Sequence, residues 1–416
     1  MSASRRVPVV RLWACVLFGY LALGATLQEL PSYVAGRFHA GPLVVGVTVG
    51  LAFAGTAAAR PLAGRAGDAG LSRGTAMVGG LLTAVAAAGH LLAPDLWVLL
   101  AARLAMGVGE AALFSSTLPW VLAGVPPSRA GRIAGWFGLS MWGGLSVGPL
   151  LAVAAGHAGG ASAVWSLVIA LPLASAALLA TTPRQAAPPR RAQARGWRGL
   201  LPRGTGTVGV ILGQAAYGYG TLTALLVLFL GTRGLGGSAI QALGLAIFSA
   251  AFLVTRAAGS PLVDRYGGLA VARWVLLAES AGLALVAMAH TGPVALCAVA
   301  VTGVGLGLIY PASTRLTLDR AAGPAAGAAV GTMTSFWDLG ILAAGPAGGL
   351  VAESLGFRAA FWTAAAIVLA SLALTSTLPQ RSPHGGRKLT KSVRGRPRAA
   401  GRSPCRHERA TPRRAS

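Results

Sequence analysis

The sequence predicts an all-α membrane protein with twelve transmembrane helices. Hydrophobic residues make up 54% of the 416 residues and charged residues only 11%, whereas soluble globular chains carry about 25% charged residues. Apolar stretches of about 20 residues, the length that crosses a bilayer as a helix, recur along the chain. Runs such as LLTAVAAAGHLL do not alternate between apolar and polar residues, as strands of a membrane barrel would. We therefore expect helical spans near 9–30, 42–63, 75–93, 96–121, 131–155, 162–181, 207–231, 238–262, 274–290, 293–314, 325–351 and 358–378.

The basic residues indicate how these spans are oriented. With the N-terminus inside the cell, one set of loops carries Arg5, Arg6, Arg65, Arg73, Arg129, Arg132, Arg265, Arg273, Arg315, Arg320 and the arginines of 184–203. The other set has only Arg37, Arg233 and Arg358. Cytoplasmic loops carry an excess of Lys and Arg, so we expect a cell-membrane protein with both termini in the cytoplasm. The basic flank and long apolar core at the start of the chain predict an uncleaved first helix rather than a signal peptide.

Several other classes of function are disfavoured by composition. The net charge of +25 is mostly explained by topology, and the basic tail from Pro379 has no aromatic residues between its arginines, so we expect no nucleic-acid binding. Three cysteines, two of them inside spans, predict neither disulfides nor a metal site.

His39, His90, His157 and His290 are assigned to outer loops, where histidines are usually solvated. The arginine, alanine and glycine content is typical of a GC-rich bacterial genome.

The chain repeats itself. A Pro- and Arg-rich segment at 182–206 divides the spans six and six, which predicts N-terminal and C-terminal six-helix bundles over 1–181 and 207–378, followed by a disordered tail over 379–416. A shift of 196 positions superposes RPLAGRAGD on RAAGSPLVD, so that Arg60 pairs with Arg256 and Asp68 with Asp264. The same shift places Trp142 opposite Asp338. Repeats of six spans are typical of secondary transporters whose substrate site lies between the halves.

This organisation resembles the major facilitator superfamily over nearly the whole chain, and three motifs resemble its drug:proton antiporter branch of twelve spans. The first motif follows span two, where GRAGDAGLSR keeps Gly64 and Asp68 of the family pattern, and its second copy SPLVDRYGG keeps Asp264, Arg265 and Gly267. The resemblance implies a gating latch in which carboxylates and guanidinium groups, with Arg60 and Arg256, pair across the halves. The alternative is loop charge with Asp as a helix cap.

The second motif lies on span four, where RLAMGVGEAA resembles the family pattern R-x-x-x-G-x-G. A charge inside a span is costly and usually faces a cavity and a partner. The resemblance implies that Arg103 tunes proton coupling. Glu110 lies about 10 Å further along the same helix face, and we interpret it as a proton carrier or as the structural partner of Arg103. Asp338, alone in an apolar helix of the second half, is the other candidate for proton binding, because burial disfavours the charged carboxyl. Glu29 and Glu279 are interpreted as interfacial or gating residues.

The third motif lies on span five, where GWFGLSMWGGLSVGPLLA supplies Gly135, Gly144, Gly148 and Pro149 of the antiporter pattern, with Ala152 in its last position. Small residues allow helices to approach closely, and proline bends a helix. The resemblance implies exchange, in which span five packs tightly on the neighbouring half and closes a leak. The alternative is ordinary small-residue packing in a glycine-rich chain.

Polar and aromatic residues at cavity depth predict where a substrate would bind. The candidates are Gln28, Phe114, Trp142, Gln214, Tyr217, Tyr219 and Trp337. Their rings offer stacking and cation–π surface, although each alone is often helix packing.

The sequence therefore predicts a proton-coupled exporter of a small organic molecule, not an enzyme, with no cofactor or metal and as a monomer in the bilayer. One alternative is a symporter or facilitator that imports a metabolite. Another is a membrane sensor or scaffold that does not transport, although buried charges at Arg103, Glu110 and Asp338 argue against it.

Overall fold

The structure is a computed structural model that describes residues 7–123, 125–183, 206–232, 237–320 and 326–378. The ordered elements are α1 (Val9–Phe38), α2 (Pro42–Asp68), α3 (Ser72–Leu92), α4 (Leu96–Leu122), α5 (Pro127–Ala180), α6 (Gly206–Thr232), α7 (Gly237–Tyr266), α8 (Gly268–Met288), α9 (Gly292–Gly307), α10 (Ile309–Leu318), α11 (Ala326–Leu355) and α12 (Phe357–Ser376). The predicted tail over 379–416 and nearly all of the predicted linker over 182–206 lie outside the described residues.

Helix α5 contains two membrane spans. Eleven helical segments among the described residues are long and apolar enough to cross a membrane, and one of them, Ile133–Ala180, has 48 residues. A continuous helix of that length would extend about 72 Å, more than twice the hydrocarbon thickness of a bilayer. The helix breaks at Gly159 and Gly160, and Gly160 has φ of 67°, a conformation that glycine adopts without strain. The chain therefore turns back there, and the predicted count of twelve spans is confirmed.

A second break divides the predicted span at 293–314. Helix α9 ends at Gly307, Leu308 is a turn residue with φ of −110° and ψ of −2°, and α10 begins at Ile309. Pro311 follows, and a proline ring clashes with the carbonyl four residues earlier and lacks an N–H donor, which explains a break at this place. Tyr310, two residues after this break, lies against Trp142 of α5 with ring centroids 5.3 Å apart.

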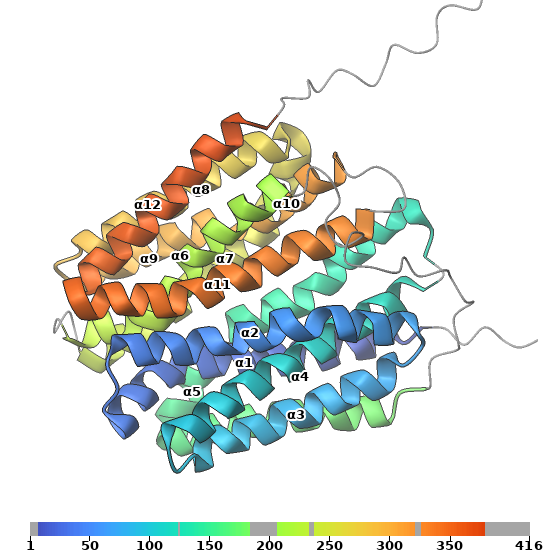
Figure 1. The fold of residues 1–416 in the computed structure, drawn as a ribbon, viewed down its shortest axis with the longest axis horizontal. Coiled ribbons are helices and arrows are strands. Elements are labelled where there is room, and N and C mark those ends of the chain that lie inside the picture. The colour runs from blue at the N-terminus through green and yellow to red at the C-terminus, as the bar shows by residue number, and fades with distance from the viewer. Residues whose placement is uncertain (1–6, 124, 184–205, 233–236, 321–325, 379–416) are drawn as a thin grey trace, which may run out of the picture. The chain divides into compact units, whose positions relative to one another are not determined.

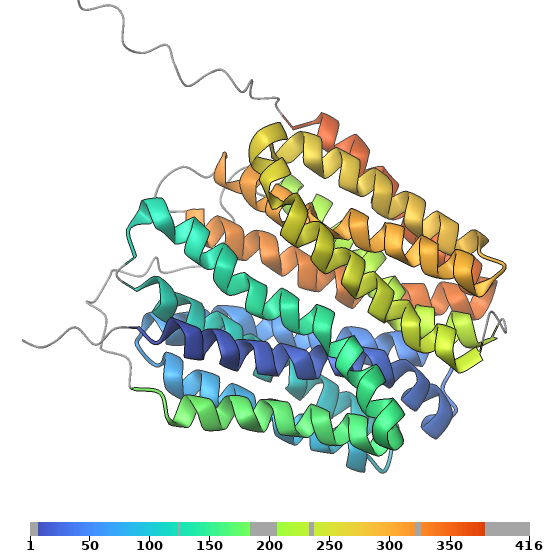
Figure 2. The same ribbon diagram turned by 180° about the vertical axis from the view of Figure 1, so that it is seen from behind.

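The helices form two groups of six spans. In the first group α1 packs on α5, and both α2 and α3 pack on α4; in the second α6 packs on α11, and α8 packs on α9 and α12. The groups meet through α2 with α11 and through α5 with α7. These two pairings are equivalent under the sequence repeat. Figures 1 and 2 show α2 beside α11 from both sides.

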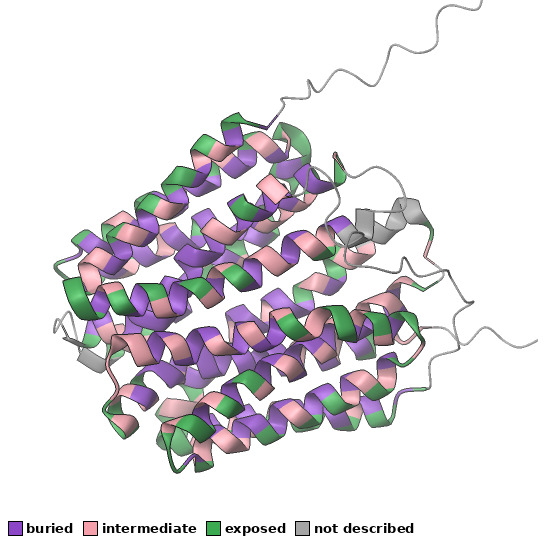
Figure 3. Ribbon diagram, viewed as in Figure 1, coloured by how far each residue is buried: buried purple, intermediate pink, exposed green. Residues whose placement is uncertain are grey.

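The two ends of the helix bundle differ in charge. We call the end where α1 begins and α2 ends the basic end, because it carries Arg65, Arg73, Arg265, Arg273 and Arg315. At the opposite end the two groups touch closely. A Cβ atom built at Gly349 would lie 2.5 Å from the carbonyl oxygen of Pro42, and the main-chain nitrogen of Leu43 donates to Oε2 of Glu353 at 3.1 Å. Figure 3 shows buried residues along the helix faces that contact other helices and exposed residues on the outer faces.

Candidate functional site

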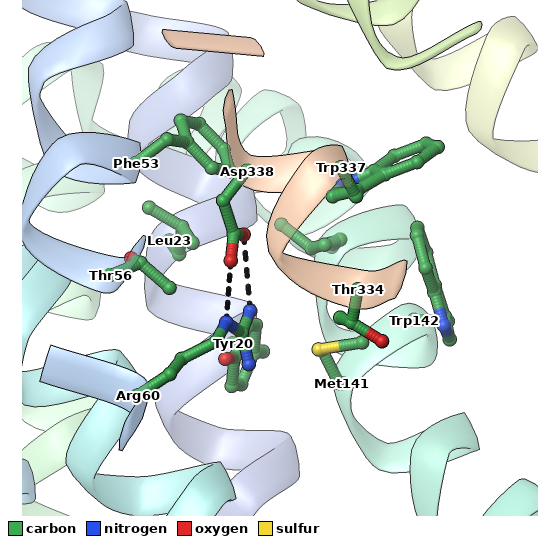
Figure 4. Close-up of a pocket in the computed structure, with 11 residues that line it drawn as sticks. Tyr20, Leu23, Phe53, Thr56, Arg60, Met141, Trp142, Thr334, Trp337 and Asp338 are labelled. Carbon is green, nitrogen blue, oxygen red and sulfur yellow. Dashed lines mark hydrogen bonds and ion pairs between the residues drawn. The ribbon is translucent and has the colours of Figure 1, made fainter. Parts of the chain in front are cut away.

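A buried ion pair joins the two halves near the middle of the molecule. Arg60 of α2 donates through Nε to Oδ2 of Asp338 on α11 at 2.5 Å and through Nη2 to Oδ1 at 3.2 Å. The side chains are 11% and 1% exposed. This two-pronged geometry is the strong form of a charged hydrogen bond, and the dashed lines in Figure 4 mark it. The expectation that Asp338 stands alone is therefore wrong, because its partner comes from the other half.

Arg60 lies deeper than the sequence indicated. The predicted span ended at residue 63, but α2 continues to Asp68, so that Arg60 is about 12 Å from the helix end. Its guanidinium lines a cavity between the halves and does not lie at the end of the helix. The cavity is lined by Tyr20, Leu23, Phe53, Thr56, Arg60, Met141, Trp142, Leu145, Thr334, Trp337 and Asp338.

Indole rings close one side of this cavity. Trp142 of α5 and Trp337 of α11 meet edge to face with ring centroids 4.9 Å apart, and Figure 4 shows both across the α11 ribbon from the ion pair. The space that remains has room for about one water molecule. A larger molecule can enter only when the indoles or the halves move.

Trp142 also borders a second space on its far side. That space is lined by Trp142, Leu145, Ser146, Tyr219, Phe248, Ser249, Phe252 and Leu306. Arg256 of α7 lies above the ring of Trp142, with its Cζ 5.2 Å from the centroid, and also faces the rings of Phe252 and Tyr310. Arg256 therefore lies beside the central rings, deeper than the gating position at the inner end of the span that the sequence predicted.

Arg103 and Glu110 do not form the structural pair that was one interpretation of span four. Both are fully buried. The Arg103 guanidinium donates through Nε to the carbonyl oxygen of Thr48 at 3.0 Å and through Nη2 to that of Val49 at 3.1 Å. It thereby links α4 to α2. The carboxyl oxygens of Glu110 have no hydrogen-bond partner, which leaves this side chain as a buried carboxyl facing α1.

Tyr20 connects Glu110 to the ion pair. Its hydroxyl donates to the main-chain carbonyl oxygen of Glu110 at 3.4 Å, and its side chain lines the cavity beside Arg60. A Cβ atom built at Gly19 would lie 3.6 Å from Oε2 of Glu110, so the carboxyl is directed at α1, one residue before Tyr20. The acid, the phenol and the ion pair thus occupy adjacent positions across α4, α1, α2 and α11.

Glu279 is a second buried carboxyl without a partner. It lies in the middle of α8, is fully buried, and neither oxygen has a hydrogen-bond partner. A Cβ atom built at Gly218 of α6 would lie 2.6 Å from its Oε1. The interfacial interpretation of Glu279 is wrong, because the residue lies inside the second half, and the gating interpretation stays a prediction.

The glycines of span five face their own half. A Cβ atom at Gly144 would lie 2.5 Å from that of Tyr20, and one at Gly148 would lie 2.6 Å from the nitrogen of Ala25. Both neighbours are on α1. The expectation that these glycines pack on the neighbouring half is wrong in this conformation, and Gly135 has open space around it. Pro149 lies inside the same helix.

The loop motifs lie at the basic end. Asp68, Asp264 and Arg265 are exposed, and Gly267 takes φ of 82° between α7 and α8. Gly64 contacts only the carbonyl oxygen of Ser115, at 3.9 Å from a built Cβ. The latch across the halves stays a prediction.

The predicted cavity residues fall into two sets. Trp142 and Trp337 line the first space, and Trp142 and Tyr219 line the second. The other four, which line neither space, are Gln28 of α1, Phe114 of α4, and Gln214 and Tyr217 of α6. Phe114 stacks on Phe137 at 5.8 Å inside the first half.

Sequence reasoning missed Tyr20, Phe53, Thr56 and Tyr310 as residues near the cavity. One available signal was the repeat itself, which pairs Arg60 with Arg256 and Asp338 with Trp142. The structure brings one member of each equivalent pair together with one of the other, Arg60 with Asp338 and Arg256 with Trp142.

His90 is also placed differently from the prediction. It lies in α3 rather than in a loop, is fully buried, and stacks on Trp165 with centroids 5.7 Å apart. Among the residues that the structure describes, no group of three His, Cys, Asp or Glu side chains is arranged to hold a metal ion.

Comparison with known proteins gives the family. A sequence profile of the Major Facilitator Superfamily matches residues 12–345 and, in a second match, 242–411. An uncharacterized MFS-type transporter of Salmonella typhimurium is 29% identical over 389 residues, which cover 90% of this chain and 97% of that one. One from Burkholderia mallei is 30% identical over 374 residues, covering 87% and 89% of the two chains.

Solved structures show the same fold. A bacterial homologue of the human lysosomal transporter Spinster, in an inward-facing and occupied conformation, superposes with a TM-score of 0.71 at 13% identity, over 90% of this chain and 98% of that one. The nucleoside transporter NupG superposes with a TM-score of 0.69 at 14% identity, over 89% and 98%. With twelve spans in two groups and a cavity between them, the chain belongs to the Major Facilitator Superfamily, a family of transport proteins rather than enzymes.

Proposed function

We propose that this transporter exports a small organic molecule in exchange for protons, with its basic end in the cytoplasm. The observation that carries the proposal is the Arg60–Asp338 pair, since it is buried, joins the halves and lines the cavity between them. Alternating access requires the halves to move against each other around such a site. An ion pair across the halves is a contact that protonation can remove.

The proton acts on the pair through charge. When Asp338 is protonated, Arg60 is left as a buried charge without compensation, which is strongly destabilising. The halves then separate enough to admit water or substrate. The charged and titratable groups around the pair are Tyr20 of α1, Glu110 of α4 and Tyr310 of α10. Glu110 is unpaired, and we assign it as the second proton-binding carboxyl.

The direction of transport rests on span five. Gly144, Gly148 and Pro149 match the antiporter pattern, and in the structure the two glycines allow α5 to lie against α1. Trp142 of the same helix contacts Trp337 of α11 and Arg256 of α7, and so lies at the boundary between the halves. Import of a metabolite by the same fold is the second candidate, and it differs in the direction of substrate movement under a proton gradient.

The first test needs no knowledge of the substrate. Spin labels at two exposed positions of the opposite end, Leu92 and Leu355, report the separation of the halves after the native cysteines are replaced. We expect the wild-type distance distribution to change between about pH 8 and about pH 5. Asp338→Asn should give the acid form at both pH values, because its side chain carries no charge.

Asp319→Asn is the matched control, since Asp319 is an exposed carboxylate of the same half. It should behave as the wild type. The coupling role of the pair would be refuted if the distance distribution of the wild type did not change with pH. It would also be refuted if the distribution of Asp338→Asn changed with pH as much as that of the wild type.

The second test determines the direction of substrate transport. Everted vesicles with an acidic interior are given a panel of small organic compounds, and a pH-sensing dye records proton loss. Export in the cell corresponds to uptake into these vesicles with proton release. Uptake that instead requires an acidic exterior would establish the importer.

A further inference from the structure

We propose that the substrate is an organic anion, whose carboxylate or similar acidic group binds Arg256 while its apolar part lies against Trp142 and its neighbouring rings. The inference rests on the proposed function, because it assumes that the central cavity is the transport site. It begins from the two arginines that the repeat pairs, Arg60 and Arg256.

The two arginines occupy equivalent positions but have different partners. Arg60 of α2 is neutralised by Asp338 of α11. The repeat places Trp142 at the position equivalent to Asp338, and the structure indeed puts Arg256 above the ring of Trp142, at 5.2 Å. Where the first site has a carboxylate, the second has an indole. The second arginine therefore lacks the anion that the symmetry of the fold would supply.

Arg256 has little other compensation. It is 8% exposed, and its Nη1 is buried without a hydrogen-bond partner. The contacts that the structure gives its guanidinium are the faces of Trp142, Phe252 and Tyr310. Aromatic faces attract a cation, but they offer no acceptor for the N–H groups of the planar fork. A buried charge without an acceptor is costly, and a carboxylate is the group whose geometry the fork matches.

The lining of the second space suits the remainder of such a molecule by its chemistry, and the rings or the halves must move apart to admit it, because the space has room for about one water molecule in this conformation. The space beyond Trp142 is lined by the rings of Tyr219, Phe248 and Phe252 and by the hydroxyl groups of Ser146 and Ser249. Flat apolar groups stack on such rings. The Arg60–Asp338 pair on the other side of Trp142 is internally neutral, so that Arg256 is the arginine without an anionic partner among the described residues that contact Trp142.

The substrate class is tested by binding to the purified full-length protein. The probes are radiolabelled benzoate and 1-naphthoate, each compared with its neutral amide and with the corresponding methylammonium cation, near pH 7.5. We expect each carboxylate to bind more tightly than its amide and its cation. Arg256→Gln should weaken carboxylate binding by about ten- to a hundred-fold, as expected for loss of a charged hydrogen bond, and should leave amide binding little changed.

Variants at Trp142 test the effect of the carboxylate that the second arginine lacks. Trp142→Asp restores the carboxylate that the repeat lacks, and it should pair with Arg256 and abolish the preference for carboxylates. Trp142→Asn removes the same ring without adding charge, and it should keep that preference at reduced affinity. Arg315→Gln, an exposed arginine of the same half, is the control and should bind as the wild type.

The outcomes separate this inference from the proposed function. If no carboxylate binds better than its amide, or if Arg256→Gln binds carboxylates like the wild type, the assignment of an anionic substrate is overturned. The pH-dependent label distances are measured on Arg256→Gln as well, and they should persist because Arg60 and Asp338 are intact. Loss of the carboxylate preference with a normal pH response supports the inference. Carboxylate binding through Arg256 without any pH response in the wild type would instead refute proton coupling alone.

Discussion

Arg103 and Glu110 lie on one face of α4 but have separate roles in the structure. Arg103 donates hydrogen bonds to the carbonyl oxygens of Thr48 and Val49, whereas the carboxyl of Glu110 has no hydrogen-bond partner. The arginine therefore contributes to the contact between α2 and α4. The glutamate contributes no side-chain hydrogen bond to the fold, which is the property expected of a group that must gain and lose a proton.

Because the two side chains have separate roles, we expect their substitution to change the free energy of unfolding by different amounts. Arg103→Gln should lower the free energy of unfolding by about 2 kcal/mol, because it removes charged hydrogen bonds to buried carbonyl groups. Glu110→Gln should change it by less than about 0.5 kcal/mol, since no partner is lost. Thermal unfolding in detergent measures both, and the double variant gives the coupling energy. A coupling above about 1 kcal/mol would show that the two residues form a structural pair.

Helix α5 shows how glycine serves packing at the scale of an element. Gly144 and Gly148 bring the α5 backbone against α1, and close approach of this kind is the usual role of small residues between membrane helices. Gly138 lies on the same helix with nothing within 4 Å of a built Cβ. The same substitution at the two kinds of position therefore separates packing from helix propensity.

Gly144→Ala should destabilise the protein by about 1–3 kcal/mol, the usual range for overpacking, because the added methyl meets Tyr20 and Leu21. Gly138→Ala should be neutral or slightly stabilising. Thermal unfolding of the two variants provides the comparison. If both variants were equally stable, the space between α1 and α5 at Gly144 would be large enough for a methyl group, contrary to the structure.

The elements also show which features were predictable from sequence. Hydropathy located the twelve spans because each must be about as long as the bilayer is thick. It placed the end of the second span at residue 63, since polar and basic residues follow, whereas backbone hydrogen bonding continues α2 to Asp68. Arg60 was therefore placed at the inner end of the span, as a gating residue, and not deep inside it. Its partner Asp338 lies 278 positions away, and a contact between halves has no signature in local periodicity.

At the scale of the whole molecule, the contact between α2 and α11 closes the opposite end. Gly46 and Gly345 meet backbone to backbone, and a Cβ atom at Gly46 would overlap the carbonyl group of Gly345. A Cβ atom at Gly50 would lie 3.1 Å from the carbonyl oxygen of Leu342 one turn deeper. Pro346 lies in α11 at this contact, 3.5 Å from the same built Cβ. Alternating access requires this contact to break and form in each cycle.

Gly46→Val should hold the opposite end apart, because the added side chain cannot occupy the space of the Gly345 backbone. The distance between labels at Leu92 and Leu355 should lengthen at every pH, and transport should be lost while the protein remains folded. Gly74→Val is the control, since a Cβ atom at Gly74 of α3 meets nothing within 4 Å. If Gly46→Val keeps the wild-type distance distribution and activity, the Gly46–Gly345 contact is not the closure on which alternating access depends.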